Sequence, residues 1–309
     1  NIAVWGLGDH AQNRIIPALS AMDEIKLIGV CSRNSQVVDA CAKKWGCYGW
    51  NDSEQMLNST EVDIVYIATP IGIHFSLAKQ ALEAGKHVWC EKPLTCRYID
   101  TQALVSLAEK KGKVLTESFM YLYHSQFHRV KKFVNDSKGV YSVVCRFGIP
   151  ALDRPGFRNS SELCGGALWD VATYTVSALL SLFPNQQVKV IFSEVLTKKG
   201  LQVDNEGRAV LRFSQGATAY LEWGVGVGYK NEIDLWTKDG SFFTDKIFSK
   251  PKEYRPQYQI RDLNGNESLE NGEQSEQFID MFRNFLWIMN DKEQALTERE
   301  NILKRAKLM

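Results

Sequence analysis

The stretch that decides the fold opens the chain and reads Ile2-Ala3-Val4-Trp5-Gly6-Leu7-Gly8-Asp9-His10-Ala11. Four apolar residues, typical of a buried strand, run into a G-x-G-x-x-A turn. In such a strand–turn–helix unit, the first glycine permits a tight turn, the second lets the backbone approach a pyrophosphate, and the small third residue lets the helix pack on the strand. The pyrophosphate accepts hydrogen bonds from N–H groups at the helix start. The turn therefore predicts dinucleotide binding by Gly6, Gly8, Asp9, His10 and Ala11, with a ligand-free glycine turn as the alternative.

Around this turn, the first 120 residues alternate short apolar runs with helical patterns. The runs are 2–5, 25–31, 62–68, 87–90 and 113–116, and the helical pattern of 75–84 stops at Gly85. Strands that alternate with helices form a parallel sheet covered on both faces. We therefore predict an α/β unit over residues 1–120, a doubly wound parallel sheet of the Rossmann type.

The character of the sequence changes after residue 120. Runs rich in β-branched and aromatic residues follow one another with turn signals between them, at 141–147, 188–196, 209–213, 218–223 and 232–237. This order predicts a second, α+β domain over 121–309 with a largely antiparallel open sheet. Helices are expected at 126–135, 169–182 and 273–289, and the polar segment 262–276 is expected to be a surface loop.

The composition excludes several classes of partner. The chain has 309 residues with 37 Lys+Arg against 36 Asp+Glu, so it lacks the basic field that nucleic acid or an anionic membrane would require. No apolar run approaches the roughly 20 residues of a membrane helix. The first residues read as a strand rather than as a secretion leader, so secretion is not expected, and the seven cysteines include no C-x-x-C pair. We expect a cytoplasmic protein with reduced, mostly buried thiols and no metal site.

The end of the second predicted strand bears on the choice of dinucleotide. A carboxylate there would bind the adenosine ribose and repel a 2′-phosphate. The sequence instead has Ser32 and Arg33, which can hydrogen-bond a phosphate and stack on adenine. We therefore expect NADP, with NAD as the alternative cofactor and a solvated turn as the alternative role of Arg33.

Four further motifs resemble the glucose-fructose oxidoreductase and inositol dehydrogenase family, over residues 1 to about 240. They are Ala68-Thr69-Pro70 with His74, Gly85-Lys86-His87-Val88, Glu91-Lys92-Pro93, and Gly165-Gly166 followed by Asp170 and Tyr174. The resemblance implies that Ala68, Thr69, Pro70, His74, Glu91 and Lys92 lie against the cofactor. It also implies a cis peptide at Pro93, with Lys92 beside the nicotinamide and the substrate oxygen.

The residues themselves support a catalytic reading. Lys92 follows a predicted parallel strand, at the carboxyl edge where open α/β sheets bind ligands, and its ammonium can stabilise charge on a reacting oxygen. Asp170 and Tyr174 are four residues apart, so they share one face of a helix. We assign Tyr174 to proton transfer, Lys92 to its electrostatic support and Asp170 to substrate orientation. The alternatives are a surface lysine paired with Glu91 and a core aromatic at 174.

Two departures from the family pattern limit what the resemblance implies, and the missing arginine removes a substrate contact known in the family. Cys164 stands where many relatives have a first glycine, and Tyr121-Leu122-Tyr123-His124-Ser125-Gln126 lacks their arginine. Tyr174 replaces a common histidine, and with the segments 123–126 and 147–150 it resembles reductases of keto groups on nucleotide-linked deoxysugars. We expect His124 and Arg158 to contact the substrate. Arg154 and Arg158 suit a substrate diphosphate, with a solvated loop of ordinary charges as the alternative.

The predicted activity is hydride transfer between NADP(H) and a carbinol or ketone carbon of a sugar or nucleotide-linked sugar. The alternatives are a non-catalytic dinucleotide-binding regulator and, as the resemblance implies for one branch, redox-assisted cleavage of glycosides. The family analogy also implies a homodimer or homotetramer formed through the open sheet.

Overall fold

The computed structural model describes all 309 residues and divides into two compact units. The first unit comprises residues 1–118 and 278–308, and the second comprises 119–277. The predicted break at residue 120 lies close to the observed one. The prediction placed 278–308 in the second domain, whereas the structure groups this segment with the first unit.

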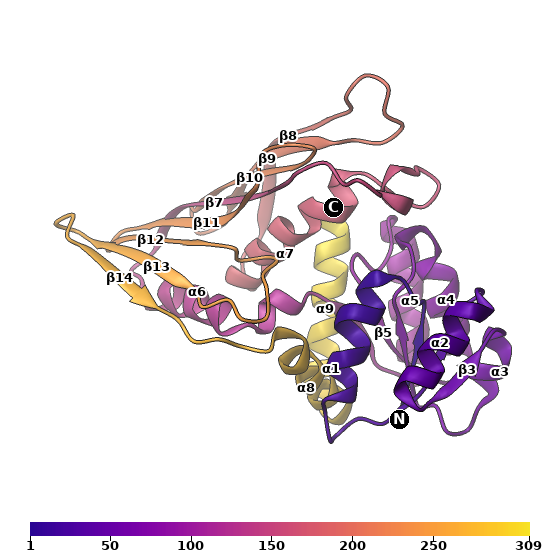
Figure 1. Ribbon diagram of the computed structural model, residues 1–309. Coiled ribbons are helices and arrows are strands. Elements are labelled where there is room, and N and C mark those ends of the chain that lie inside the picture. Colours follow the sequence, from indigo (N-terminus) through magenta and orange to yellow (C-terminus); the bar gives the residue numbers. More distant parts are fainter. The chain divides into compact units, whose positions relative to one another are not determined.

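The first unit contains a six-stranded, wholly parallel sheet in the order β3-β2-β1-β4-β5-β6 (Figure 1). Its strands are β1 (Ile2–Trp5), β2 (Leu27–Cys31), β3 (Tyr48–Trp50), β4 (Ile64–Ile67), β5 (His87–Glu91) and β6 (Leu115–Ser118). This strand order places the crevice at the carboxyl end of β1, where the order reverses. The predicted doubly wound parallel sheet is confirmed.

Helices join these strands. They are η1 (Ala11–Ile15), α1 (Ile16–Ser20), α2 (Ser35–Trp45), α3 (Ser53–Asn58), η2 (Ile71–Ile73), α4 (His74–Glu83) and α5 (Tyr98–Lys111). The ends follow local chemistry, since the Asn34 side chain accepts a hydrogen bond from Val37 N and Gly46 takes φ +63° after α2. Gly85 takes φ +75° just beyond α4, as the sequence predicted. β1 and β4 are buried at every residue, as strands covered on both faces must be.

The carboxyl-terminal segment packs onto the first unit through its aromatic and aliphatic residues. It forms α8 (Gln277–Asn290) and α9 (Lys292–Leu308). Phe282 stacks on Trp89 of β5 at 5.7 Å between ring centroids, and Ile302 belongs to the apolar core of this unit. Burial of these side chains explains why the segment joins the first unit although it follows the second in sequence.

The second unit is built on an eight-stranded sheet in the order β14-β13-β12-β11-β7-β10-β9-β8. All neighbours are antiparallel except β7 and β10, so the predicted, largely antiparallel sheet is confirmed. The strands are β7 (Val140–Ile149), β8 (Val188–Leu196), β9 (Glu206–Phe213), β10 (Thr218–Val225), β11 (Lys230–Thr237), β12 (Gly240–Asp245), β13 (Gln257–Asp262) and β14 (Glu267–Asn271). Its helices are η3 (Met120–Tyr123), α6 (Ser125–Asp136), η4 (Gly156–Asn159), η5 (Leu168–Ala172) and α7 (Thr173–Leu182).

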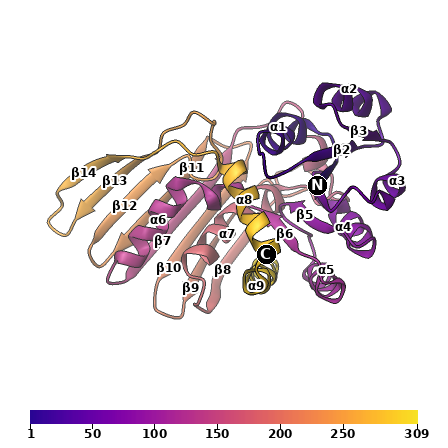
Figure 2. The same cartoon turned by 90° about the horizontal axis from the view of Figure 1, so that it is seen from below.

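Helices α6 and α7 lie on one face of this sheet (Figure 2), and the nearly edge-on view of Figure 1 shows no helix against the other face. Side chains along the strands accordingly alternate between buried and exposed, and Leu221 and Leu235 are buried whereas Tyr220 and Trp236 are exposed. Exposed large apolar residues on the face without helices, with the loop before β11, are Tyr141, Phe192, Tyr220, Tyr229, Trp236 and Leu269. We call this set the open face.

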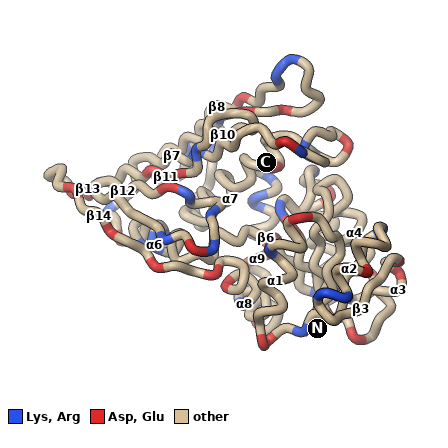
Figure 3. The backbone as a smooth tube through the Cα atoms, in the orientation of Figure 1, with Lys and Arg blue, Asp and Glu red and all other residues tan.

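One predicted loop is wrong, because β14 lies inside the segment 262–276. All five residues of β14 are exposed, so its sequence carries no apolar alternation, and only backbone pairing with β13 at the sheet edge defines it. Both signs of charge are interspersed along the chain (Figure 3), and no helix could span a membrane. Cys31, Cys41, Cys47, Cys90 and Cys145 are free thiols, as expected. Cys96 and Cys164 are not among the free thiols, so the expectation that the thiols are reduced is wrong for these two.

Candidate active site

Gly6 and Gly8 sit at the carboxyl end of β1 and show why this turn excludes side chains. Gly6 takes φ +107°, and a Cβ there would come within 2.6 Å of Ala68 O, so the close approach of the β4 loop requires glycine. A Cβ at Gly8 would meet no atom within 4 Å, so the backbone at Gly8 borders open space before η1. A backbone open at the start of a helix fits the approach of a pyrophosphate.

The start of this helical segment is tied to the end of β5. His10 Nε2 lies 2.9 Å from Glu91 Oε1, and the Tyr66 hydroxyl donates to the same oxygen at 2.6 Å. The second oxygen, Oε2, accepts a weaker bond from Lys92 N at 3.4 Å. Burial alone would raise the pKa of Glu91, but His10, Tyr66 and Lys92 together lower it to about 2. Glu91 is therefore a fixed anion that connects the glycine turn to Lys92.

Ser32 and Arg33 follow β2 at the same edge of the sheet. Ser32 is partly buried and its backbone N donates to Trp50 O at 3.2 Å, whereas Arg33 is exposed. No carboxylate occupies positions 31–34. The Arg33 guanidinium can therefore reach a ligand phosphate without first breaking an ion pair with a neighbouring carboxylate.

Thr69 and Pro70 follow β4, and Thr69 is connected to the Lys92 loop through His74. The His74 ring is completely buried, with Nε2 2.8 Å from Thr69 O and Nδ1 2.9 Å from Pro93 O. Burial lowers the pKa of His74, although both carbonyls favour the charged ring. Both nitrogens thus face backbone oxygens, which makes His74 a support between two loops rather than a direct contact of a ligand. The buried Thr69 hydroxyl has no hydrogen-bond partner, and such an orphaned group fits a loop completed by a bound cofactor.

Lys92 immediately follows β5 and is largely buried. The peptide bond between Lys92 and Pro93 is cis, as the resemblance implied. The first unit therefore brings Gly6, Gly8, Ser32, Thr69, Glu91 and Lys92 to the carboxyl edge of one sheet.

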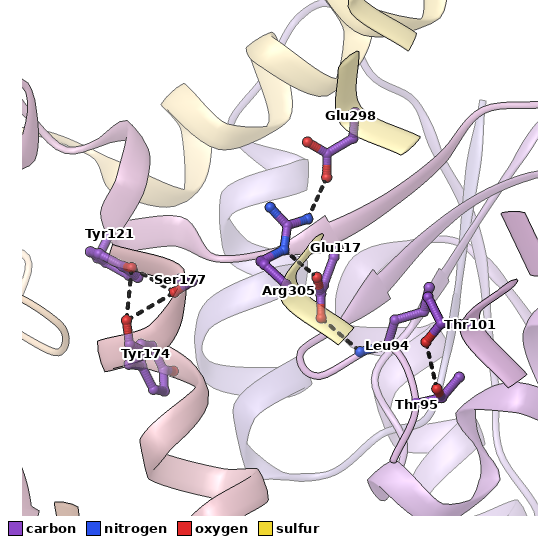
Figure 4. Close-up of polar contacts among 9 residues, drawn as sticks. All are labelled: Leu94, Thr95, Thr101, Glu117, Tyr121, Tyr174, Ser177, Glu298 and Arg305. Carbon is purple, nitrogen blue, oxygen red and sulfur yellow. Dashed lines mark hydrogen bonds and ion pairs between the residues drawn. The ribbon is translucent and has the colours of Figure 1, made fainter. Parts of the chain in front are cut away.

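In the second unit, Tyr174 lies among aromatic rings near the start of α7. Its ring centroid is 5.2 Å from that of Phe147 and 6.0 Å from those of Phe119 and Phe248. Its backbone carbonyl accepts hydrogen bonds from the hydroxyls of Tyr121 at 3.0 Å and Ser177 at 2.9 Å (Figure 4). Rings on several sides and two bonds to the carbonyl fix the position of the phenol.

Asp170 lies in a π-helical turn, η5, that leads into α7. Such turns occur frequently at functional sites. Asp170 Oδ2 accepts a bond of 2.6 Å from Arg158 Nε, so two residues predicted to meet the substrate are paired with each other. The charge of Arg158 is thereby engaged, and exposed Arg154 is the remaining candidate for a diphosphate.

The glycines before η5 are required by close packing. A Cβ on Gly165 would overlap Arg158 O, and one on Gly166, which has φ +106°, would overlap the Asp204 carboxylate. Asp204 Oδ2 accepts a hydrogen bond of 2.7 Å from Leu168 N at the start of η5. Asp204 thus caps the turn that carries Asp170, a role that no local motif reveals.

His124, expected at the substrate, is only 1% exposed. Its Nδ1 accepts a hydrogen bond of 3.0 Å from Gln126 N, so the ring caps the start of α6. Burial, with a smaller contribution from Lys250, lowers the pKa of His124 to about 3. This geometry differs from the expected substrate contact, because the side chain caps the start of α6 inside the unit.

Replacing His124 by asparagine is expected to make the free energy of unfolding depend less on pH below pH 6.5. Asparagine also caps helices, so the free energy of unfolding near pH 7.5 changes little. In the wild type the folded pKa of about 3 lies below the ordinary value of 6.5, so stability is complete above pH 6.5 and declines as the pH falls towards 3. Urea unfolding at several pH values between 7.5 and 4 measures the free energy of unfolding. Its slope against pH is expected to be smaller in His124→Asn than in the wild type, by at most about 1.4 kcal/mol per pH unit. Parallel profiles would contradict this assignment.

Comparison with known proteins gives matches in both units. A model of the oxidoreductase family with an NAD-binding Rossmann fold matches residues 1–119, and a model of the GFO/IDH/MocA C-terminal domain matches residues 129–243. A dTDP-3,4-didehydro-2,6-dideoxy-alpha-D-glucose 3-reductase of Streptomyces violaceoruber is 33% identical over 269 residues, which are 86% of this chain and 78% of that protein. A D-xylose 1-dehydrogenase (NADP(+)) of Haloferax volcanii is 31% identical, over 80% of this chain and 76% of that protein.

Solved structures give a similar result. The 3-ketoreductase KijD10 of Actinomadura kijaniata, crystallised with NADP and TDP-benzene, superposes with a TM-score of 0.92. It is 26% identical in sequence, and the match covers 99% of this chain and 94% of that one.

Proposed function

Because the chain belongs to the GFO/IDH/MocA family of oxidoreductases, we propose that it reduces the ketone of a nucleotide-linked deoxysugar with NADPH. The family resemblance expected from the sequence motifs is confirmed. The observation that carries the proposal is the clustering of Gly6, Gly8, Thr69 and Lys92 at one edge of the Rossmann sheet, together with a fixed Tyr174 on its own helix.

The carboxyl edge of the first sheet is proposed to hold NADP. Gly6 and Gly8 would accommodate the pyrophosphate, Ser32 and Arg33 the 2′-phosphate, and Thr69 with Pro70 the nicotinamide side. When bound, the cofactor supplies the hydride that is added to the carbonyl carbon. The absence of a carboxylate after β2 favours NADPH over NADH.

Lys92 and Tyr174 are proposed to act on the substrate oxygen. The Lys92 ammonium would stabilise the negative charge that develops on this oxygen as the carbon is reduced. The Tyr174 hydroxyl would donate its proton to the same oxygen, and a nearby cation would favour the phenolate that remains. Asp170, held by Arg158, would orient neighbouring hydroxyl groups of the sugar.

A screen of NADPH oxidation tests the proposal. The substrates are dTDP-linked 3-keto-deoxysugars, free ketosugars and inosones, with NADH in parallel. We expect turnover of the nucleotide-linked ketones at rates at least tenfold above the free sugars. Oxidation with inosones alone would overturn the substrate class, and no oxidation with any ketone would favour a dinucleotide-binding regulator.

The third candidate, redox-assisted glycoside cleavage, is separated by its products. A glycosidase of this kind releases free sugar without a net change in NADPH. We expect the opposite result, with NADPH consumed in equal amount to the ketone and no sugar released.

Replacing Arg33 by alanine is expected to weaken binding of NADPH and spare NADH. Charge-assisted hydrogen bonds contribute about 1.5–3 kcal/mol, which corresponds to roughly a ten- to hundredfold rise in the Kd for NADPH. Calorimetry of wild type and Arg33→Ala with both cofactors measures this, and NADH acts as the internal control because it lacks the 2′-phosphate. Tighter binding of NADH than NADPH by the wild type would contradict the proposed roles of Ser32 and Arg33.

The open face is proposed to join copies of the chain. An apolar surface of this kind marks a contact with protein, and a self-complementary sheet suits a homodimer or homotetramer. Sedimentation of the chain as a monomer of 35.1 kDa would count against this proposal. We also propose that the protein is cytoplasmic, as expected from the sequence.

A further inference from the structure

Each of the three residues after Lys92 contacts a side chain of a different element, Pro93 and Leu94 through the backbone and Thr95 through its hydroxyl. Pro93 O faces His74 Nδ1 of α4 at 2.9 Å, and Leu94 N donates to Glu117 Oε1 of β6 at 2.8 Å. The Thr95 hydroxyl lies 2.7 Å from that of Thr101 in α5. Three successive residues therefore have fixed partners, which restricts the positions that the preceding Lys92 can take.

Glu117 is in turn held by the last helix of the chain. Its Oε2 accepts a hydrogen bond of 2.6 Å from Arg305 Nε, and Arg305 Nη2 donates to Glu298 Oε1 at 2.8 Å (Figure 4). Arg305 and Glu298 both lie in α9, and Arg305 is 188 positions from Glu117 in sequence. A chain of contacts thus runs from α9 through β6 to the loop that carries Lys92.

The cluster of Glu117, Arg305 and Glu298 is nearly shielded from water. The three residues are 5%, 8% and 8% exposed, respectively. Burial alone would lower the pKa of Arg305, but the two carboxylates raise it, so the guanidinium stays charged. A buried charge cluster is weak evidence for stability, because apolar residues of the same volume often serve as well.

Stability alone does not explain where the oxygen atoms of Glu117 are directed. One oxygen meets the helix and the other meets the amide of Leu94, two residues after Lys92. Glu298 pairs with Arg305 and hydrogen-bonds the backbone of Glu117 rather than the amide of Leu94. The two carboxylates therefore differ in the bond to Leu94 N, which an experiment can use.

We infer that Glu117, clamped by Arg305 of the carboxyl-terminal helix, is a positioning residue that sets the Lys92 ammonium for reduction of the ketone. This inference rests on the proposed role of Lys92. A displacement of about 1 Å at a reacting group can lower the rate about hundredfold, so the loss of one loop anchor is expected to appear in kcat.

The test compares Glu117→Met with its matched control Glu298→Met in the full chain. Each variant removes one carboxylate from the same guanidinium, but only Glu117→Met removes the acceptor of Leu94 N. With the ketosugar that the wild type turns over, we expect kcat to fall about ten- to hundredfold in Glu117→Met and less than about threefold in Glu298→Met. The Kd for NADPH should stay within about threefold in both. Equal losses of kcat in the two variants would overturn the inference.

A double-mutant cycle separates positioning from general damage to the fold. If Glu117 acts through Lys92, Glu117→Met causes no further loss of kcat in a Lys92→Met background. The same loss in both backgrounds would overturn the inference while leaving the role of Lys92 intact. Retention of kcat within about tenfold in Lys92→Met alone would instead overturn the proposed function.

If Glu117→Met does not fold, the same cycle is run with Glu117→Gln. The amide has one oxygen for two donors, Leu94 N and Arg305 Nε, so either the loop or the helix loses its bond. We expect a smaller loss of kcat, about three- to tenfold, that again disappears in the Lys92→Met background. Persistence of the loss in that background would overturn the inference.

Discussion

Lys92→Met lowers kcat by about 10²–10⁴-fold while the fold and the binding of NADPH are kept. The substitution preserves the length and apolar stem of the side chain and removes only the ammonium. The developing negative charge on the substrate oxygen then loses its cation, and proton transfer from Tyr174 loses its electrostatic support. Steady-state kinetics with the best ketosugar of the screen, together with calorimetry of NADPH binding, measures both quantities.

Lys86→Met is the matched control. Lys86 and Lys92 flank the same strand, β5, but Lys86 lies at its amino end, where Nζ donates to Ser59 O at 2.8 Å and Val62 O at 2.7 Å. We expect Lys86→Met to lose some stability and to keep kcat within about threefold. A Lys92→Met variant within about tenfold of wild type would show that Lys92 is not catalytic.

Arg305→Met lowers the free energy of unfolding by about 3–5 kcal/mol. The substitution leaves the carboxylates of Glu117 and Glu298 buried near each other without their shared cation. Burial already raises the pKa of Glu298 against the opposing effect of Arg305, so without that cation its ionised form is further disfavoured. Urea unfolding followed by tryptophan fluorescence, to which buried Trp89 of this unit contributes, measures the change.

Two comparisons isolate the cause of this loss. Arg283→Met breaks the exposed pair with Glu24, at 3.1 Å, and should leave stability nearly unchanged. Replacing Glu117, Glu298 and Arg305 together by methionine should recover most of the stability, because no unpaired charge remains. The triple variant should nevertheless stay slow, since Leu94 N has no acceptor. Full recovery of kcat in the triple variant would show that the cluster only stabilises the fold.

The sequence predicted the elements whose residues carry a local pattern. β1 and the glycine turn follow from apolar residues before Gly6, and α4 ends where Gly85 takes a left-handed conformation. β14 was missed because an exposed edge strand is defined by its pairing with β13. The position of 278–308 was missed because the packing of Phe282 on Trp89 joins residues far apart in sequence.

The same distinction holds for the candidate site. Lys92, Asp170 and Tyr174 stand in recognisable motifs, and the pairing of Asp170 with Arg158 lies within a short segment. His74 and His124 have the chemistry of ligand-binding residues, yet backbone groups occupy their nitrogens, which sequence cannot show. No sequence motif indicated the roles of Glu117 and Arg305, because a hydrogen bond between residues 188 positions apart has no local pattern.

Transfer of deuterium tests the central claim most directly. The protein is incubated with a nucleotide-linked 3-ketosugar and with NADPH that carries deuterium at C4, on one face in one experiment and on the other face in a second. The mass of the product is measured by mass spectrometry. The account predicts one deuterium in the product from one of the two labelled cofactors, bound at the reduced carbon, and none from the other. Product without deuterium from either cofactor, or no product at all, would contradict hydride transfer to the sugar carbon.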